Sequence, residues 1–219
     1  MKLFLDTADV DAVRTWVHTG LIDGLTTNPT HLSAQQHNPT EIIQTLCSLL
    51  PHGQISVEVT EKEPQKVYEQ AHKIAALSPN ILVKIPCHAD YYGVIKKLVQ
   101  EKIRINITLV FSLAQALFMA KLNVEYVSPF IGRLDDNNID GAALLYEMRT
   151  VFNTYKCTTK ILAASLRHAQ HVTDALLAGA DALTLPVGLF EKIIQHPLTD
   201  RGMELFDRDW QKLQITQFP

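Results

Sequence analysis

The stretch Ile81-Leu82-Val83-Lys84-Ile85-Pro86 is a short apolar run that surrounds a single lysine and ends at a proline. Because the run is rich in β-branched residues, it predicts a strand that is buried on both faces. Burying a charged ammonium is costly unless it is paired or loses its proton. Lys84 is therefore either a strand-end lysine whose amine reaches water or a carboxylate, or a lysine nucleophile.

The composition is that of an ordinary globular protein, with 219 residues, of which 47% are hydrophobic and 20% are charged. A single domain over residues 1–219 is expected, because α/β barrels of this length often run undivided. The net charge of −3, without a basic run, gives no support for nucleic-acid or membrane partners. Three widely spaced cysteines favour a reducing compartment. Without a signal-peptide pattern or an apolar run of membrane length, we expect a cytoplasmic protein.

Strand and helix patterns alternate along the whole chain. Such alternation implies a parallel sheet, and eight units predict an α/β fold made of a single (β/α)8 (TIM) barrel. An open doubly wound sheet is the alternative, but Asp6-Thr7-Ala8-Asp9 is not the glycine-rich loop that should follow its first strand. Residues 199–213 predict an extra C-terminal helix. The expected strands are residues 3–7, 25–28, 55–59, 81–86, 104–110, 126–130, 160–165 and 182–186.

Polar residues stand near the C-terminal end of the predicted strands, on the face opposite the apolar one. Side chains alternate along a strand, so in a closed barrel one face lines the interior. These residues should then meet at the mouth where barrel enzymes carry out chemistry. The alternative for each is a polar strand end with an ordinary partner. The set is Asp6, Asn28, Glu58, Lys84, Asn106, Thr108, Ser128 and Ser165, and Thr26 shares a strand face with Asn28.

A metal centre is not expected among these residues. None of the nine histidines falls on a predicted strand, whereas a zinc or iron site would favour imidazoles there. His168 and His171 lie three residues apart on a predicted helix, and we expect both to be surface residues.

A lysine that shares a pocket with two carboxylates suggests carbonyl chemistry through a Schiff base. A neutral amine attacks a ketone, and the iminium then accepts electrons from an adjacent C–C bond. Asp6 and Glu58 are candidates for the proton-transfer groups. Asn28, Asn106 and Ser128 offer neutral hydrogen bonds that suit sugar hydroxyls.

An anion site is expected at the same mouth. Ser165 and Arg167 lie where the seventh strand passes into its helix, and Arg133 follows the sixth strand. Barrel loops in this region often hold phosphate. The alternative is that the arginines pair with Asp135 or Asp136 on the surface.

At these residues the chain resembles the transaldolase family, in the short bacterial and archaeal form that is related to fructose-6-phosphate aldolase. The resemblance covers essentially the whole chain. Its motifs are Leu5-Asp6-Thr7-Ala8, Thr26-Thr27-Asn28-Pro29, Val83-Lys84-Ile85-Pro86, residues 106–112 (NITLVFS), Tyr126-Val127-Ser128-Pro129-Phe130, Gly132-Arg133-Leu134-Asp135-Asp136, Ala163-Ala164-Ser165-Leu166-Arg167 and His196-Pro197-Leu198-Thr199-Asp200.

The resemblance implies a class I aldolase-type barrel that moves a dihydroxyacetone unit from sedoheptulose 7-phosphate to glyceraldehyde 3-phosphate. The products would be erythrose 4-phosphate and fructose 6-phosphate, in the non-oxidative pentose phosphate pathway. Lys84 matches the Schiff-base lysine and Asp6 the acid that takes the C4-hydroxyl proton. Glu58 and Thr108 match the pair that positions a proton-shuttling water. Sugar contacts match Thr26, Asn28, Asn106, Ser128 and Phe130, and phosphate contacts match Arg133, Ser165 and Arg167.

Two positions favour a transferase over a simple aldolase. Related aldolases resemble this chain but carry glutamine and tyrosine where it has Glu58 and Phe130. An aldolase that releases free dihydroxyacetone is the first alternative, and a non-enzymatic sugar-phosphate-binding barrel, with Lys84 in an ion pair with Asp6 or Glu58, is the second.

Other features of the resemblance concern a loop, the cofactor and the assembly. The family often has threonine and glycine after the lysine strand, whereas here the loop reads Cys87-His88-Ala89-Asp90-Tyr91-Tyr92-Gly93. No metal or organic cofactor is implied. The short form resembles homo-oligomers, decamers of two pentameric rings, in which the C-terminal helix packs on a neighbouring subunit.

Overall fold

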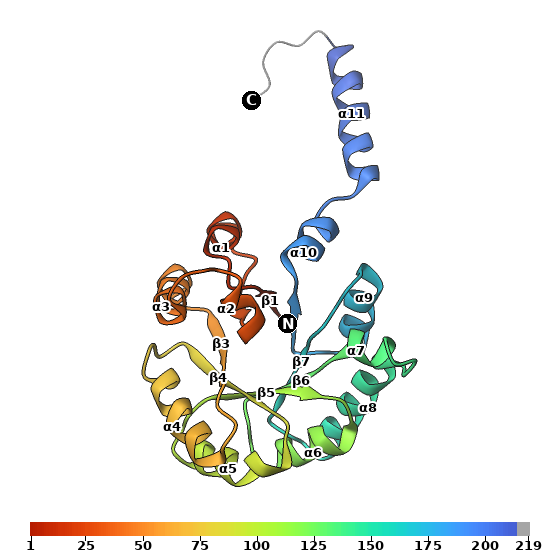
Figure 1. Cartoon of the computed structure of the whole chain (residues 1–219). Coiled ribbons are helices and arrows are strands. Elements are labelled where there is room, and N and C mark those ends of the chain that lie inside the picture. Colours follow the sequence, from red (N-terminus) through yellow and green to blue (C-terminus); the bar gives the residue numbers. More distant parts are fainter. Residues whose placement is uncertain (214–219) are drawn as a thin grey trace.

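Eight parallel strands close into a barrel in which each strand pairs with its neighbours in sequence and β8 pairs with β1 (Figure 1). The structure, a computed structural model, describes residues 1–213. The closed order confirms the predicted (β/α)8 barrel and rules out the open sheet. The strands are β1 (Lys2–Asp6), β2 (Gly24–Thr26), β3 (Gln54–Glu58), β4 (Ile81–Pro86), β5 (Ile105–Val110), β6 (Tyr126–Pro129), β7 (Lys160–Ala163) and β8 (Ala182–Leu185).

Helices surround the barrel, and the starts of several follow from capping residues. The side chain of Asp9 accepts hydrogen bonds from two backbone N–H groups of α1, and the side chain of Ser112 caps α6. The helices are α1 (Val10–Val17), α2 (Pro29–Ser33), α3 (Pro39–Leu49), α4 (Pro64–Ala75), η1 (Ala89–Tyr91), α5 (Tyr92–Gln100), α6 (Leu113–Lys121), α7 (Ile131–Asp135), α8 (Gly141–Thr154), α9 (Ala169–Leu177), α10 (Val187–Ile193) and α11 (Pro197–Gln211).

Two of these helices, α2 and α7, are short and were not predicted. Both begin within three residues of a strand end, at Pro29 and Ile131. Each has only five residues, which is too short for a helical apolar period to appear in the sequence. Both contribute residues to the site described below.

The apolar core forms two layers, one between the strands and the helices and one inside the barrel. Val83 and Ile85 belong to the outer layer, whereas Leu82 belongs to the inner one. The inner layer contains Phe4, Leu82, Tyr126, Leu162, Ala164 and Ala182. This division follows the alternation of side chains along each strand.

Polar side chains close the barrel at the N-terminal ends of its strands. Tyr126 donates through its hydroxyl to Gln54 Oε1 at 2.9 Å, and Gln54 Nε2 donates to Glu125 at 3.0 Å. Arg104 donates two hydrogen bonds to Glu125, at 2.7 and 2.9 Å. With this end filled, the barrel opens at the C-terminal ends of its strands.

Helix α11 extends away from the barrel in Figure 1. None of its residues is buried. Its exposed apolar side chains include Leu198, Met203, Leu205 and Phe206. An extra C-terminal helix is therefore confirmed, two residues earlier than expected, whereas residues 214–219 of the expected single domain lie outside the described residues. Within residues 1–213, no helix is long and apolar enough to cross a membrane.

Candidate active site

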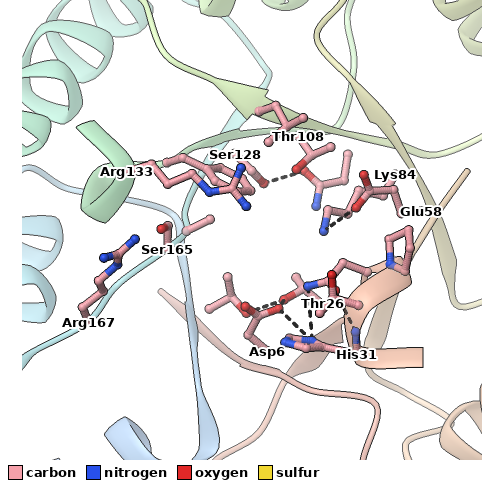
Figure 2. A pocket seen from close by; sticks show the side chains of 18 residues that line it. Asp6, Thr26, His31, Glu58, Lys84, Thr108, Ser128, Arg133, Ser165 and Arg167 are labelled. Carbon is pink, nitrogen blue, oxygen red and sulfur yellow. Dashed lines mark hydrogen bonds and ion pairs between the residues drawn. The ribbon is translucent and has the colours of Figure 1, made fainter. Parts of the chain in front are cut away.

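A cavity of about 460 Å³ opens at the C-terminal ends of the strands (Figure 2). The twelve residues that the sequence singled out all line it: Asp6, Thr26, Asn28, Glu58, Lys84, Asn106, Thr108, Ser128, Phe130, Arg133, Ser165 and Arg167. The barrel thus brings together side chains from strands spread over the whole chain. Six further lining residues were not singled out: Pro29, Thr30, His31, Leu109, Ala164 and Thr184.

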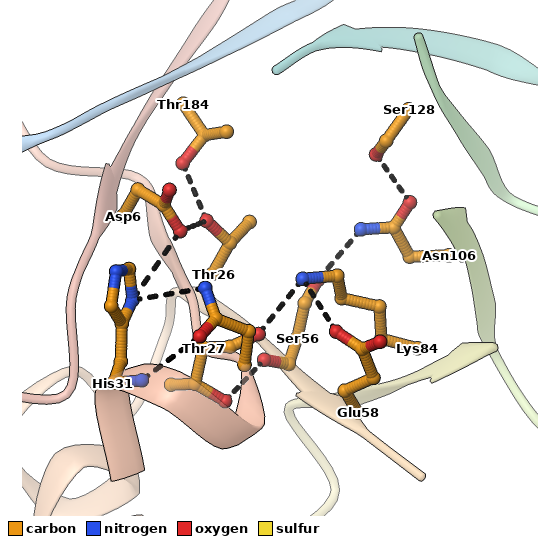
Figure 3. A network of polar contacts seen from close by, with 11 residues as sticks. Asp6, Thr26, Thr27, His31, Ser56, Glu58, Lys84, Asn106, Ser128 and Thr184 are labelled. Carbon is orange, nitrogen blue, oxygen red and sulfur yellow. Dashed lines mark hydrogen bonds and ion pairs between the residues drawn. The ribbon is translucent and has the colours of Figure 1, made fainter. Parts of the chain in front are cut away.

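Lys84 lies on β4 with only 5% of its surface exposed. Its Nζ is 3.0 Å from Glu58 Oε2 and donates to the Thr27 carbonyl oxygen at 2.9 Å (Figure 3). Glu58 is near because it stands in register with Lys84 on the neighbouring strand β3. The two acceptors take two of the tetrahedral directions around Nζ. The third free direction holds an N–H in the ammonium and a lone pair in the neutral amine.

A chain of neutral groups lies beside the lysine. Ser128 donates to Asn106 Oδ1 at 2.7 Å, and Asn106 Nδ2 donates to Ser56 Oγ at 3.1 Å (Figure 3). Thr108 Oγ1, also buried, has no hydrogen-bond partner among residues 1–213. Buried polar atoms in proteins are rarely left without a partner, so this hydroxyl is suited to a bound molecule.

Asp6 faces the same cavity from β1. Its Oδ1 accepts a hydrogen bond from Thr26 at 2.8 Å. Thr26 Oγ1 is also 2.6 Å from Thr184 Oγ1. Since the single hydroxyl proton of Thr26 goes to the carboxylate, Thr184 is the donor in the second contact. The threonines thus orient Asp6, and Thr184 could have been found because the predicted eighth strand carries it between two leucines.

His31 is a lining residue that the sequence analysis missed. It lies on α2, and its Nδ1 is 3.7 Å from Asp6 Oδ1 and 3.3 Å from Asn28 Nδ2 (Figure 3). Its backbone N–H donates to Asn28 Oδ1 at 2.9 Å, which caps the helix. His31 was missed because α2 was not predicted. The helix that starts at Pro29 turns position 31 toward the strand ends.

The predicted anion-binding residues lie on the side of the cavity away from Lys84 and Glu58 (Figure 2). Ser165 adopts a positive φ of 61°, and its carbonyl oxygen accepts from Gly132 N at 3.1 Å. A Cβ on Gly132 would stand 2.4 Å from that oxygen, so only glycine fits there. The guanidinium of Arg133 is 5.0 Å from the ring of Phe130.

Arg167 was expected either to bind an anion in the cavity or to pair with a surface aspartate, and its position agrees with both. It lines the cavity, yet its guanidinium also donates to both carboxylate oxygens of Asp136, at 2.6 Å each. Half of each side chain is exposed, at 49%. An anion that binds Arg167 must therefore compete with this carboxylate.

The expectation that His171 is a surface residue is wrong, whereas His168 is exposed as expected. Only 5% of His171 is exposed, because it lies on the inward face of α9. Its Nε2 is 2.6 Å from Asp135 Oδ2, and its Nδ1 accepts from Arg167 N at 3.2 Å. Burial raises the pKa of Asp135, but hydrogen bonds from Gly141 and His171 outweigh it and hold that pKa below its ordinary value.

The loop that departs from the family pattern, Cys87–Gly93, does not line the cavity. A contact outside the cavity holds this loop, in which the Tyr91 hydroxyl donates to the Lys62 carbonyl oxygen at 2.9 Å. Burial raises the pKa of the Cys87 thiol. Among residues 1–213, no group of three or more His, Cys, Asp or Glu side chains is placed to hold a metal ion.

Comparison with known proteins agrees with the motifs. A family model described as transaldolase/fructose-6-phosphate aldolase matches residues 3–217. Proteins named probable transaldolase are 44% identical over 213 residues in Parvibaculum lavamentivorans, with 97% of each chain covered, and 42% identical over 210 residues in Caulobacter vibrioides, with 96% of each chain covered. A similar protein from Dehalococcoides mccartyi is 40% identical over 215 residues, which cover 98% of this chain and all of that one.

Among solved structures, a double variant of flavocytochrome b2 with sulfite bound has a similar fold. The TM-score is 0.61 at 13% identity, and the match covers 85% of this chain and 56% of that one. At this identity the similarity concerns the barrel alone.

Proposed function

Because this chain belongs to the transaldolase/fructose-6-phosphate aldolase family, we propose that it is a transaldolase that works through a Schiff base on Lys84. It transfers a dihydroxyacetone unit from sedoheptulose 7-phosphate to glyceraldehyde 3-phosphate. Erythrose 4-phosphate and fructose 6-phosphate are the products, as in the non-oxidative pentose phosphate pathway, and the enzyme works in the cytoplasm without a cofactor.

The observation that carries the proposal is the setting of Lys84. Its amine is buried in a cavity, with Glu58 Oε2 at 3.0 Å and the Thr27 carbonyl oxygen at 2.9 Å. When Glu58 takes the proton of its own contact, rotation about the Cε–Nζ bond can turn the two remaining N–H bonds toward Glu58 and the Thr27 carbonyl oxygen. The lone pair then occupies the remaining direction around Nζ and is available to a ketone carbon. Glu58 thus pairs with the Lys84 ammonium in the resting protein and accepts its proton when the amine is activated.

The bond changes can be assigned to this chain's own groups. The amine attacks the donor ketone to give a carbinolamine, and Glu58 returns its proton to the carbinolamine hydroxyl, which leaves as water and gives an iminium on Nζ. Asp6 takes the proton from the hydroxyl at C4, the C–O becomes C=O, and the C3–C4 electrons pass to the iminium to form an enamine. The enamine carbon then attacks the acceptor aldehyde, and Asp6 returns its proton to the new alkoxide. Hydrolysis of the second iminium releases the product.

Other cavity residues support substrate binding and water handling. The buried, unpartnered hydroxyl of Thr108 is suited to hold the water that leaves and returns, together with Glu58. Thr26, Asn28, Asn106, Ser128 and Phe130 would contact the sugar. Arg133, Ser165 and Arg167 would hold the phosphate at the other side of the cavity.

Trapping with borohydride tests the covalent step. The protein is incubated with fructose 6-phosphate and sodium borohydride, and the labelled peptide is identified by mass spectrometry. The expected result is a reduced adduct on Lys84 and none in Lys84→Met, which keeps an unbranched side chain only one atom shorter and has no amine. Wild-type protein without an adduct would contradict the Schiff-base mechanism and favour a non-enzymatic sugar-phosphate-binding barrel, for which the Lys84–Glu58 ion pair is the supporting observation.

A second assay separates transferase from aldolase. Sedoheptulose 7-phosphate is supplied with and without glyceraldehyde 3-phosphate, and erythrose 4-phosphate is measured. Turnover that needs the acceptor supports the transferase, whereas release of free dihydroxyacetone without it supports the aldolase. Glu58→Gln combined with Phe130→Tyr should raise the aldolase-to-transferase ratio.

We also propose that the protein forms a homo-oligomer, a decamer of two pentameric rings, in which α11 packs on a neighbouring subunit. The support is that α11 carries exposed apolar side chains and has no buried residue of its own. Light scattering of the full-length protein measures the mass. Phe206→Asp should reduce the assembly to smaller species, and Arg201→Asp, a charge change on the same helix, serves as its control.

A further inference from the structure

His31 lies between two groups to which the proposed function gives separate tasks, and its Nδ1 cannot serve both. Asn28 Nδ2 is 3.3 Å from Nδ1, and Asp6 Oδ1 is 3.7 Å from it. Asn28 Nδ2 can only donate, and a carboxylate oxygen can only accept. A bare Nδ1 therefore suits Asn28, whereas a protonated Nδ1 suits Asp6.

The hydrogen bonds around Asn28 decide between these states. The backbone N–H of His31 can only donate, so the Asn28 atom that meets it at 2.9 Å is the oxygen Oδ1. The other end of the amide is then the donor Nδ2, and it faces Nδ1 of His31. Nδ1 accepts from it, and the ring proton of the neutral imidazole stands on Nε2.

We propose that His31 is a positioning residue for the Asp6 side of the cavity. As a neutral imidazole with a bare Nδ1, it holds the amide of Asn28 at both ends, through its ring and through its backbone. One N–H of Asn28 Nδ2 remains free for a substrate hydroxyl. Because Nδ1 has no proton to donate, Asp6 Oδ1 keeps Thr26 as its hydrogen-bond donor and remains a ready proton acceptor.

Two substitutions at one position separate this role from packing. His31→Asn can place an amide oxygen where Nδ1 stands, whereas His31→Leu has nearly the same branched shape without an acceptor. Both variants keep the backbone N–H that caps α2. Loss of one neutral hydrogen bond is worth about 0.5–1.5 kcal/mol, so His31→Leu should lower kcat/KM for the phosphorylated donor by roughly 2- to 12-fold. His31→Asn should stay within about twofold of the wild type.

A double-mutant cycle shows whether His31 acts through Asn28. In an Asn28→Ala background, His31→Leu should have little further effect on kcat/KM, because the contact is already lost. Equal losses in His31→Leu and His31→Asn would overturn the proposal, and so would fully additive losses in the cycle.

A spectroscopic measurement gives a result that does not depend on turnover, although the kinetic arm rests on the proposed function. The full-length protein is labelled with ¹⁵N-histidine, and the His31 signals are assigned as those missing from His31→Asn. At neutral pH, we expect an unprotonated Nδ1 and a protonated Nε2. A proton on Nδ1 would overturn the proposal. If no adduct forms on Lys84 but this tautomer is found, the proposed function fails while the role of His31 in holding Asn28 stands.

Discussion

The pairing of Arg167 with Asp136 predicts that removing one carboxylate will improve phosphate binding. In the free protein, both nitrogens of the Arg167 fork donate to Asp136, at 2.6 Å each. A phosphate that binds Arg167 must displace this carboxylate or share the charge of the guanidinium with it, because Asp136 uses two of the five N–H donors. Asp136→Asn keeps the size of the side chain but removes its charge, so the arginine is easier to recruit.

The size of the effect follows from the exposure of the pair. Both side chains are 49% exposed, and exposed ion pairs contribute about 0.2–1 kcal/mol. The bidentate geometry favours the upper half of that range, about 0.5–1 kcal/mol, which is a factor of about 2 to 5 in affinity. Asp136→Asn should therefore lower KM for fructose 6-phosphate about 2- to 5-fold, and the inhibition constant of inorganic phosphate should fall by a similar factor.

Two controls make the measurement specific. Glu147→Gln removes the same charge from an exposed position outside the cavity and should leave KM unchanged. Dihydroxyacetone as an unphosphorylated donor should show no gain with Asp136→Asn. An unchanged or higher KM for the phosphorylated donor in Asp136→Asn would refute the competition, and would mean that Asp136 supports Arg167 in the bound state as well.

Three further predictions concern the water site, the closed end of the barrel and the glycine beside Ser165. Thr108→Val removes a buried hydroxyl that has no partner among residues 1–213, so denaturant unfolding should show no loss of stability. If this hydroxyl positions the reacting water, kcat should fall about 10²-fold. An unchanged kcat would rule out that role. Burial raises the pKa of Glu125, but the hydrogen bonds and charge of Arg104 outweigh burial and hold that pKa below its ordinary value. The ionised Glu125 therefore stabilises the protein fully above its unfolded-state pKa, about 4.3. This stabilisation is lost as the pH falls through the pKa of Glu125 in the folded state. Glu125→Gln should cost about 1–3 kcal/mol at pH 7 in urea unfolding, with a gap to the wild type that narrows below about pH 4, and a gap independent of pH would contradict this. Gly132→Ala places a Cβ 2.4 Å from the Ser165 carbonyl oxygen and should destabilise the protein by about 1–3 kcal/mol, whereas Gly202→Ala, with open space around it on α11, should be neutral or stabilising.

Most of the architecture could be predicted because its signals are local. The apolar run around Lys84 and the helix that Ser112 caps are visible within a few residues of sequence. Strand parity then placed Lys84 and Asp6 on the inner face, since alternation is a property of the extended chain itself. The ends of the helices and strands were harder to predict than the elements themselves. A five-residue helix such as α2 is too short to show an apolar helical period. His31 was missed for that reason.

The partners of the site residues were decided by tertiary contacts. His171 is buried because α9 packs its inward face against the α7 region, where Asp135 meets it, and nothing in the spacing of two histidines shows this. Arg167 binds Asp136 because β6 and β7 are neighbouring strands, so the segments that follow their C-terminal ends lie side by side.

The lysine strand shows the same division. The sequence by itself determined that Lys84 stands on the inner face of a barrel strand, near the mouth, with Asp6 and Glu58 in the same cavity. Only the closed barrel decided which carboxylate pairs with it. Strand β3 is hydrogen-bonded to β4 with Glu58 in register with Lys84, whereas β1 pairs with β2 and β8. Register between strands depends on contacts far apart in the chain, and for that reason no local pattern could have chosen Glu58 over Asp6.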